Sequence, residues 1–146
     1  MIVNRAISLT QPWATLMAIG AKGVETRSWK TVYRGWIAIH AAKAFPLHCK
    51  TLCRTQPFAS SLAKAGIEDL NSIPLGCVIA VVSLVKCLPA EMLTDLPWVE
   101  RAFGDYSSGR YGFLCSDLRR LREPIPMKGA LGIWRLDRPI RDEDLI

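Results

Sequence analysis

The sequence predicts an α+β domain, in which short helices pack around a small mixed β-barrel. Three observations support this fold class. The chain has 146 residues, the size of one ordinary domain with room for a sizeable core. Short apolar runs with strand-like patterns recur along it, and the helical patterns between them are brief. No repeat, low-complexity stretch or linker divides the sequence, so residues 1–146 are expected to form a single domain.

Strand patterns account for much of the chain. In residues 5–9, the small side chains of Ala6 and Ser8 alternate with the large apolar side chains of Ile7 and Leu9. Residues 36–41 place Ile37 and Ile39 on one face. Residues 76–88 are apolar on both faces, which is typical of a central buried strand. The predicted strands are 5–9, 24–29, 36–41, 76–88, 111–115 and 132–136.

The predicted helices are short. The first covers 13–20, and three residues delimit it: Thr10 as N-cap, Pro12 in the first turn and Gly20 as the stop. The stretch 47–66 has a helical pattern that Pro57 interrupts, so two short helices are expected there. The remaining segments are helical turns at 89–93 and 97–103 and a rigid Pro-Ile-Pro connector at 124–126.

Composition and charge limit the partners. The formal net charge is +6 and the pI is about 9.3, a balance that favours polyanionic ligands such as nucleic acid. The longest apolar run, 77–85, is too short to span a bilayer, and Asn4 and Arg5 interrupt any signal-peptide pattern. We therefore expect a cytoplasmic protein without a membrane partner, and a monomer is the simplest assembly.

The cysteines and histidines do not predict a metal or a cofactor. Five cysteines at irregular spacing do not form a disulfide framework. His48, Cys49 and Cys53 lack a second ligand pair at zinc-finger distance, so we expect no metal site. No P-loop, dinucleotide fingerprint or nucleophile elbow is present, so no cofactor is predicted.

Three charged side chains follow the first helix within six residues. On a strand that begins at Val24, Glu25 and Arg27 point to one face and Thr26 to the other, with Lys22 in the turn before them. A carboxylate accepts hydrogen bonds from amino groups, and an arginine forks onto carbonyl or phosphate oxygens, so the group suits a planar polar ligand. The alternative is a set of surface ion pairs on a solvated face.

Aromatic residues lie close to these charges. Trp13, Trp29, Tyr33 and Trp36 are interleaved with three cations, Arg27, Lys30 and Arg34. Aromatic faces beside cations are what base stacking and phosphate neutralisation require. Trp13 lies on the apolar face of its helix, which favours a core position. His40 lies on the face opposite Ile37 and Ile39, and without a nearby nucleophile it is expected to be structural.

Three segments carry a resemblance to a known family. They are "ISLTQPWATLMAIGAKGVETRSW", "YRGWIAIHAAK" and "REPIPMKGALGIW". Together they resemble the ASCH domain, a family within the PUA-like superfamily of small β-barrels, over residues 7–136. The core of the resemblance is a Gly-x-Lys-x-x-Glu-x-Arg motif, formed by Gly20, Lys22, Glu25 and Arg27.

The resemblance implies a PUA-like barrel whose cleft binds RNA or a modified nucleotide. By motif position, the residues expected to bind the ligand are Gln11, Lys22, Glu25, Thr26, Arg27, His40 and Lys43. The basic residues expected to contact the rest of a nucleic acid are Lys30, Arg34, Arg119 and Arg120. A nucleic-acid-binding module is therefore the favoured function.

Hydrolysis is the alternative function. One ASCH-like branch removes the acetyl group from N4-acetylcytidine with a lysine, a threonine and a glutamate. Lys22 matches the lysine, but Glu25 stands where the threonine belongs, and Thr26 points to the other face. If the chain is a hydrolase, Lys22 and Glu25 would be the catalytic pair. Cleavage of RNA and a role as a protein-interaction adaptor also remain open.

Overall fold

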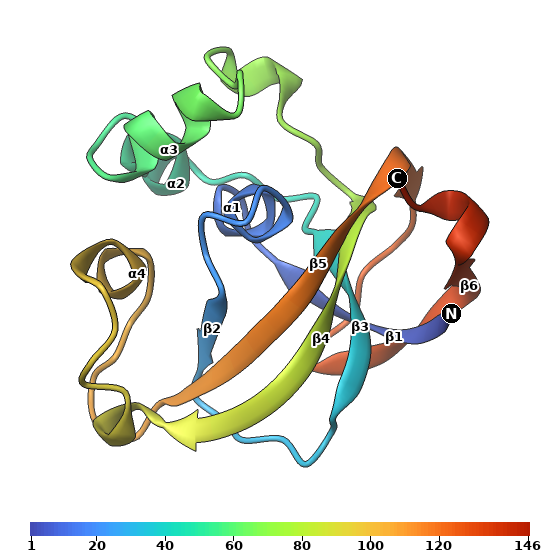
Figure 1. The fold of residues 1–146 in the computed structure, drawn as a ribbon. Coiled ribbons are helices and arrows are strands. Elements are labelled where there is room, and N and C mark those ends of the chain that lie inside the picture. Colours follow the sequence, from blue (N-terminus) through green and yellow to red (C-terminus); the bar gives the residue numbers. More distant parts are fainter.

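The computed structural model describes residues 1–146 and consists of one curved sheet with short helices (Figure 1). The strands are β1 (Ile2–Leu9), β2 (Val24–Arg27), β3 (Gly35–Ala41), β4 (Cys77–Pro89), β5 (Tyr111–Pro126) and β6 (Ile133–Arg141). The helices are α1 (Trp13–Ala18), α2 (Leu47–Leu52), α3 (Phe58–Lys64) and α4 (Trp98–Phe103). Single 3-10 turns occur at η1 (Leu70–Ser72), η2 (Ala90–Met92) and η3 (Asp142–Asp144). The longest α-helix has seven residues, and none is long and apolar enough to cross a membrane.

The six strands form one mixed sheet in the order β2-β5-β4-β3-β1-β6. Only β1 and β3 are parallel, with Ala6 opposite Ala38, and all other neighbours are antiparallel. The predicted α+β class is confirmed. Closure into a barrel is not shown, because β2 and β6 are the two edges of the sheet and no hydrogen-bonded pairing joins them.

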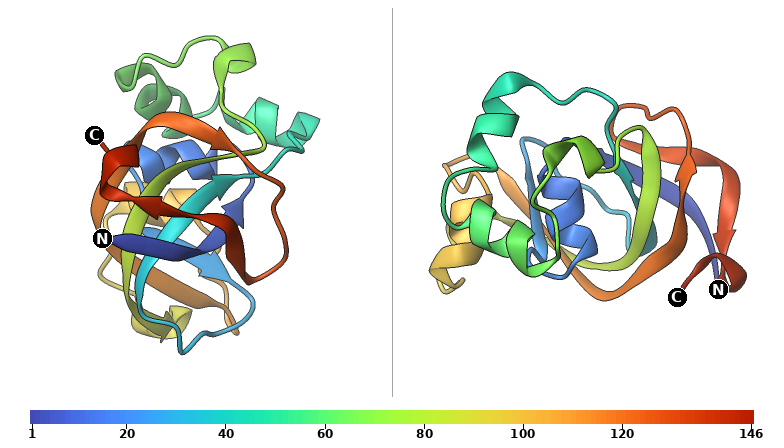
Figure 2. Two further views of the ribbon diagram at one scale, coloured as in Figure 1. Left: turned by 90° about the vertical axis from the view of Figure 1, so that its right-hand side faces the viewer. Right: turned by 90° about the horizontal axis from the view of Figure 1, so that it is seen from above.

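Two cores lie on opposite faces of this sheet. The first contains residues of α1, such as Met17, and the aliphatic side chains that β1, β3 and β4 turn toward that helix. Figure 2 shows α1 on the concave side of the sheet, between the strands and α3. The second core lies on the other face of the sheet, between the central strands and the chain around β6. It includes Trp134, Leu136, Ile140 and Leu145. Successive residues of one strand alternate between the two cores because side chains in a strand point alternately up and down.

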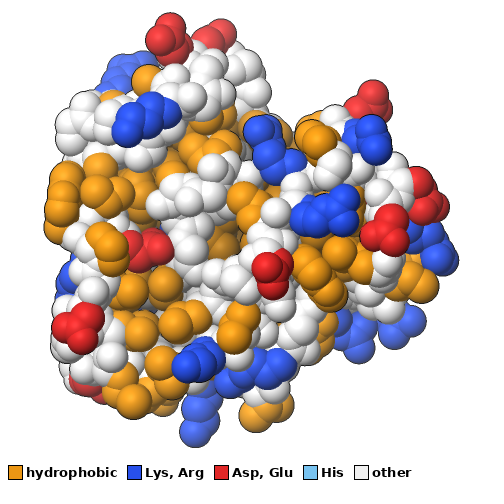
Figure 3. Space-filling model, viewed as in Figure 1, with side chains coloured by type: hydrophobic (Ala, Val, Ile, Leu, Met, Phe, Trp, Pro, Cys, Tyr) orange, Lys and Arg blue, Asp and Glu red, His pale blue; other side chains and the backbone are white.

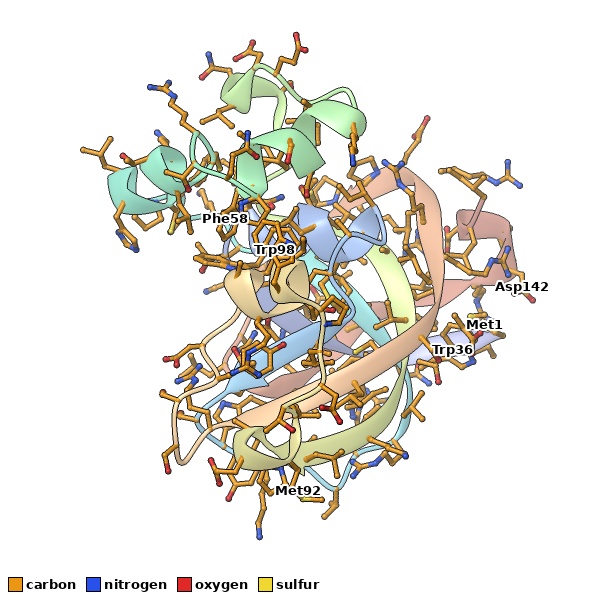
Figure 4. All side chains as sticks on the ribbon, turned by 60° about the vertical axis from the view of Figure 1, so that its left-hand side comes forward. Met1, Trp36, Phe58, Met92, Trp98 and Asp142 are labelled. Carbon is orange, nitrogen blue, oxygen red and sulfur yellow. The ribbon has the colours of Figure 1, made fainter.

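The short helices build a third, smaller cluster beside α1. It joins Leu16 to Phe58 and Phe103, whose rings meet edge to face at 5.0 Å between centroids. Two helices flank Pro57, as the sequence predicts, and Pro57 is the N-cap of the second. The two chain ends meet at one corner, where Figure 4 shows Met1 beside Asp142. The N-terminal amine lies 2.6 Å from the Asp142 carboxylate.

Two local predictions were wrong. Pro12, not Thr10, is the N-cap of α1 and no side chain caps that helix; the Thr10 carbonyl instead accepts from the Ala14 N–H at 3.4 Å. Residues 124–126 are not a separate connector but the end of β5, which is 16 residues long. Because β2 pairs only with residues 111–114, the second side of β5 is mostly a free edge beyond them. A proline that lacks an N–H is tolerated on such an edge.

Candidate functional site

Lys22, Glu25 and Arg27 form a continuous chain of ion pairs. Gly20 has a φ of 79°, which lets the chain turn out of α1, and the N–H groups of Ala21 and Lys22 both donate to the Leu16 carbonyl. The Lys22 side chain is completely buried, donates to the Val24 carbonyl and lies 3.3 Å from Glu25 Oε1. Glu25 Oε2 accepts from Arg27 Nε at 2.9 Å. One carboxylate therefore lies between two cations.

Arg27 keeps donors available for a ligand. A guanidinium has five N–H groups. The structure assigns one to Glu25 and one to the Ser8 carbonyl, which accepts from Nη2 at 2.7 Å. The guanidinium carbon also lies 5.9 Å from the centre of the Trp29 ring, a cation–π contact. Three N–H groups of a fixed, partly exposed arginine are left to meet a carbonyl or phosphate oxygen.

A cavity of about 490 Å³ opens in front of Arg27; we call it the Arg27 cavity. Residues of β2 and of the segment that leaves α4 line it, and these two segments are hydrogen-bonded to each other. Trp13 and Phe58 supply aromatic surface, with their rings edge to face at 6.2 Å. The lining residues are Ser8, Thr10, Trp13, Leu52, Phe58, Arg110, and segments 25–27 and 102–105. A lining that combines polar and aromatic groups suits a flat ligand that has both hydrogen-bonding edges and an apolar face.

The segment 104–110 contributes lining residues that the sequence did not predict. The Asp105 N–H donates to Thr26 Oγ1 at 3.1 Å, and Arg110 Nη2 donates to the Thr26 carbonyl at 3.2 Å. The Arg110 Nε lies 3.4 Å from Asp105 Oδ2. Hydrogen bonds from Ser107, and then the charge of Arg110, lower the pKa of Asp105. Composition marks this segment as a turn, but only the pairing of β2 with β5 brings it to the site.

A buried polar cluster lies beside the pairs of Lys22. Glu100, on α4, accepts from the Gly23 N–H at 2.7 Å, and burial raises the pKa of its carboxyl despite that bond and the charge of Lys22. Burial also raises the pKa of Tyr106, and the charge of Glu100 raises it further. The pKa of the Cys115 thiol is raised to about 12, first by burial and then by Glu25. Two buried atoms, Glu100 Oε2 and Tyr106 Oη, have no hydrogen-bond partner.

His40 and Lys43 line a second cavity of about 860 Å³, which we call the Lys43 cavity. Its other lining residues are Ser8, Ala42 and segments 75–76 and 127–131. Ser8 lines both cavities, so they are neighbours on either side of this residue. The site residues predicted as one cleft therefore fall into two adjoining hollows, with Thr26 and Arg27 in one and His40 and Lys43 in the other.

Several predicted site residues lie outside both cavities. Gln11 is buried, donates to the Pro74 carbonyl at 2.8 Å and accepts from the Thr15 N–H at 2.9 Å. Lys22 borders only a small void of about 150 Å³ beside Cys115. Lys30 is exposed beyond the end of β2.

The other predicted basic contacts are also dispersed. Arg34 donates to the carbonyls of Thr31 and Tyr33 within its own loop. Arg119 donates to the Ile146 carbonyl, and Arg120 lines a separate hollow beside α1 and α3. Lys and Arg side chains are spread over the face shown in Figure 3 rather than gathered in one patch. The nucleic-acid role of these residues stays a prediction.

The sequence motif agrees with the comparison to known families. The ASCH domain profile matches residues 7–124. The chain belongs to the ASCH domain family. This ASCH domain is 34% identical over 137 residues to activating signal cointegrator 1 of Homo sapiens, and 32% identical over 137 residues to that of Mus musculus. The match covers 92% of this chain and 22% of each relative, so the chain spans about a fifth of their length.

Solved structures show the same fold. The crystal structure of ASCH from Zymomonas mobilis matches with a TM-score of 0.55 at 18% identity, covering 96% of this chain and 89% of that one. A point mutant of the same protein matches with a TM-score of 0.52 at 18% identity, covering 96% and 91%. No group of three or more potential metal ligands occurs in this ASCH domain.

Proposed function

We propose that this PUA-like ASCH domain is a nucleic-acid-binding module that holds a base of single-stranded RNA in the Arg27 cavity. The observation that carries the proposal is the geometry of Arg27. Its guanidinium is held by Glu25 and the Ser8 carbonyl and still has three free N–H groups. Pre-organised donors of this kind recognise carbonyl and phosphate oxygens at little entropic cost.

The walls and the charge of the site support the same ligand class. Half-buried Trp13 and the edge of the largely buried Phe58 give the cavity aromatic surface beside polar groups, which is the environment that an unstacked base requires. Glu25 and Asp105 balance Arg27 and Arg110 along the lining, so the cavity suits a neutral base better than a bare phosphate. The net charge of +6 over the whole chain favours a polyanion as the molecule that carries this base.

The test is titration of a labelled single-stranded RNA at several salt concentrations. The wild-type protein should bind with strong salt dependence. Loss of charged hydrogen bonds in Arg27→Ala should cost about 1.5–3 kcal/mol, a roughly ten- to hundredfold loss of affinity. Arg27→Lys keeps the charge but loses the planar fork, so it should restore little of that affinity.

The matched control is Arg135→Ala, on β6 and exposed. It removes the same charge outside both cavities, so it separates the local contact from net charge. Equal losses in Arg27→Ala and Arg135→Ala would contradict the proposal. Circular dichroism of each variant checks that Arg27→Ala still folds, since that side chain also tethers β1 to β2.

Binding is favoured over hydrolysis by the position of Lys22. The hydrolase alternative needs this lysine as a nucleophile or a base that reaches substrate. Its side chain is fully buried, paired with Glu25 and absent from the lining of the Arg27 cavity. We therefore expect RNA recovered after titration to keep its full length, and N4-acetylcytidine to be recovered unchanged. Shortened RNA, or cytidine released by wild type but not by Lys22→Met, would favour the enzyme instead.

A further inference from the structure

The Lys43 cavity differs in chemistry from the Arg27 cavity. Two lysines, Lys43 and Lys128, line it, and no acidic residue does. Leu75, Met127 and Leu131 are among its apolar lining residues, and Leu131 is 99% exposed. A hollow with two cations and an exposed leucine needs a ligand that is both anionic and partly apolar.

A chain of hydrogen bonds holds the walls of this cavity in place. Trp134 Nε1 donates to Ser8 Oγ at 3.0 Å, and Ser8 Oγ lies 3.0 Å from His40 Nδ1. His40 Nε2 lies 2.7 Å from the Met127 carbonyl, which can only accept. Nε2 therefore donates to that carbonyl, and Nδ1 shares a second hydrogen bond with Ser8 Oγ. His40 thus fastens the 127–131 segment to the sheet.

Gly129 shows how closely that segment approaches the sheet. A Cβ at this position would lie 2.7 Å from His40 Cε1 and 2.7 Å from Ser8 Oγ, so only glycine fits without a shift. The four backbone N–H groups of residues 128–131 donate to no other group of the protein. Free amides beside two lysines are donors for phosphate oxygens.

We propose that the Lys43 cavity holds the nucleotide next in the strand to the one in the Arg27 cavity, so that the physiological ligand is an RNA oligonucleotide rather than a free nucleoside. This inference rests on the proposed function. The two cavities meet at Ser8, whose carbonyl accepts from Arg27 and whose hydroxyl meets His40. A strand that crosses Ser8 places a base over Arg27, and its next phosphate reaches Lys43, Lys128 and the free amides.

The charges of the two linings support placing the base in the Arg27 cavity and the phosphate in the Lys43 cavity. The lining of the Arg27 cavity has two cations and two carboxylates, whereas the lining of the Lys43 cavity has two cations alone. A phosphodiester is therefore better accommodated in the second hollow and a neutral base in the first. The aliphatic side chains of Leu75 and Leu131 then cover one face of the neighbouring sugar or base.

The experiment compares short and long ligands on the full chain. The four ribonucleoside 5′-monophosphates and a mixed-sequence octaribonucleotide compete against a labelled octamer, and the ratio of their dissociation constants is the readout. We expect the octamer to bind at least about tenfold more tightly than the best monophosphate. In Lys43→Ala/Lys128→Ala this ratio should fall by about threefold per lysine, to near one, and the salt slope by about 0.7 per lost phosphate contact.

Lys64→Ala/Lys86→Ala is the matched control, because both lysines are exposed and neither lines the two cavities. It should keep the wild-type ratio. As a second readout, the amide resonances of residues 128–131 should shift with the octamer and much less with a monophosphate.

Three results would overturn the inference. Equal ratios in the two double variants, or unmoved amide resonances at 128–131, would mean that the Lys43 cavity does not bind the strand, although the Arg27 cavity does. Equal binding of octamer and monophosphate by wild type would do the same. If wild type binds neither probe, the proposed function itself fails and this inference fails with it.

Discussion

Glu100 couples the buried polar cluster to pH at the scale of a single residue. Burial raises its pKa in the folded protein, so the folded state holds this proton more tightly than the unfolded state does. Stability from this group is therefore present at low pH, and it is lost as the pH rises from the ordinary value of 4.5 through the raised pKa. Glu100→Gln keeps an oxygen for the Gly23 N–H but carries no charge.

We expect the thermal midpoint of Glu100→Gln, measured relative to that of wild type, to increase as the pH rises from 4 to 8. Melting curves followed by circular dichroism at each pH measure this. Glu68→Gln, an exposed control, should show no such trend. A constant difference between Glu100→Gln and wild type across this range would contradict the assignment of Glu100 as the destabilised carboxyl.

Residue-level prediction from sequence succeeded where the signal was local. The spacing of Lys22, Glu25 and Arg27 placed three charges together, and the structure shows them in direct contact. The sequence missed Asp105 and Arg110, because they reach β2 only through its pairing with β5, which sets Arg27 opposite Tyr111. Such contacts depend on long-range register, and no local pattern of polar and apolar residues contains it.

Strand β5 contains a bulge that a single residue makes. Asp117 has a φ of 54°, the one non-glycine residue of the chain with a positive value. Ser116 and Arg119 lie opposite Ser83 and Val81, so Asp117 and Leu118 together oppose Val82. The left-handed conformation costs an ordinary L-residue roughly 1–2 kcal/mol, and more for β-branched side chains.

Substitutions at this bulge should therefore depend on the backbone. Asp117→Val should lower the free energy of unfolding by about 1–2 kcal/mol, and Asp117→Gly should change it by less than about 1 kcal/mol. Urea denaturation of both variants measures the effect. Ser116→Val adds the same side chain one residue earlier, where φ is negative, and should cost little. Equal losses in the two valine variants would mean that the bulge stores no strain.

Element-level prediction was better for position than for extent. Strand patterns found all six strands and Pro57 separated α2 from α3, because periodicity and helix breakers act within a few residues. The ends of β5 and β6 were placed too early. Polar residues follow the apolar part of each strand, and the ladder continues through them because backbone hydrogen bonds do not require apolar side chains.

At the scale of the whole molecule, the two cores share their strands. In β3, Ile37 and Ile39 belong to the core around α1, and Ala38, between them, belongs to the core against β6. The sequence predicted the first of these faces correctly. It also predicted a barrel, but closure is not shown, because β2 and β6 are unpaired edges. Curvature is hard to predict from sequence, since twist accumulates over six strands and depends on what fills each face.

This sharing predicts that the molecule unfolds as one unit. Met17→Ala opens a cavity in the core around α1, and Leu136→Ala opens one in the core against β6, at an expected cost of about 2–5 kcal/mol each. Because β1, β3 and β4 contribute to both cores, each substitution should speed amide exchange in all protected strands, including those that contribute to the other core. Val32→Ala, at a side chain that is 98% exposed, should neither lower the stability nor speed exchange.

If Leu136→Ala released β6 alone and left exchange in α1 and β4 at the wild-type rate, the two faces would be separate folding units. The Trp134–Ser8–His40 chain would then loosen without weakening Arg27, and the second cavity could vary independently of the first.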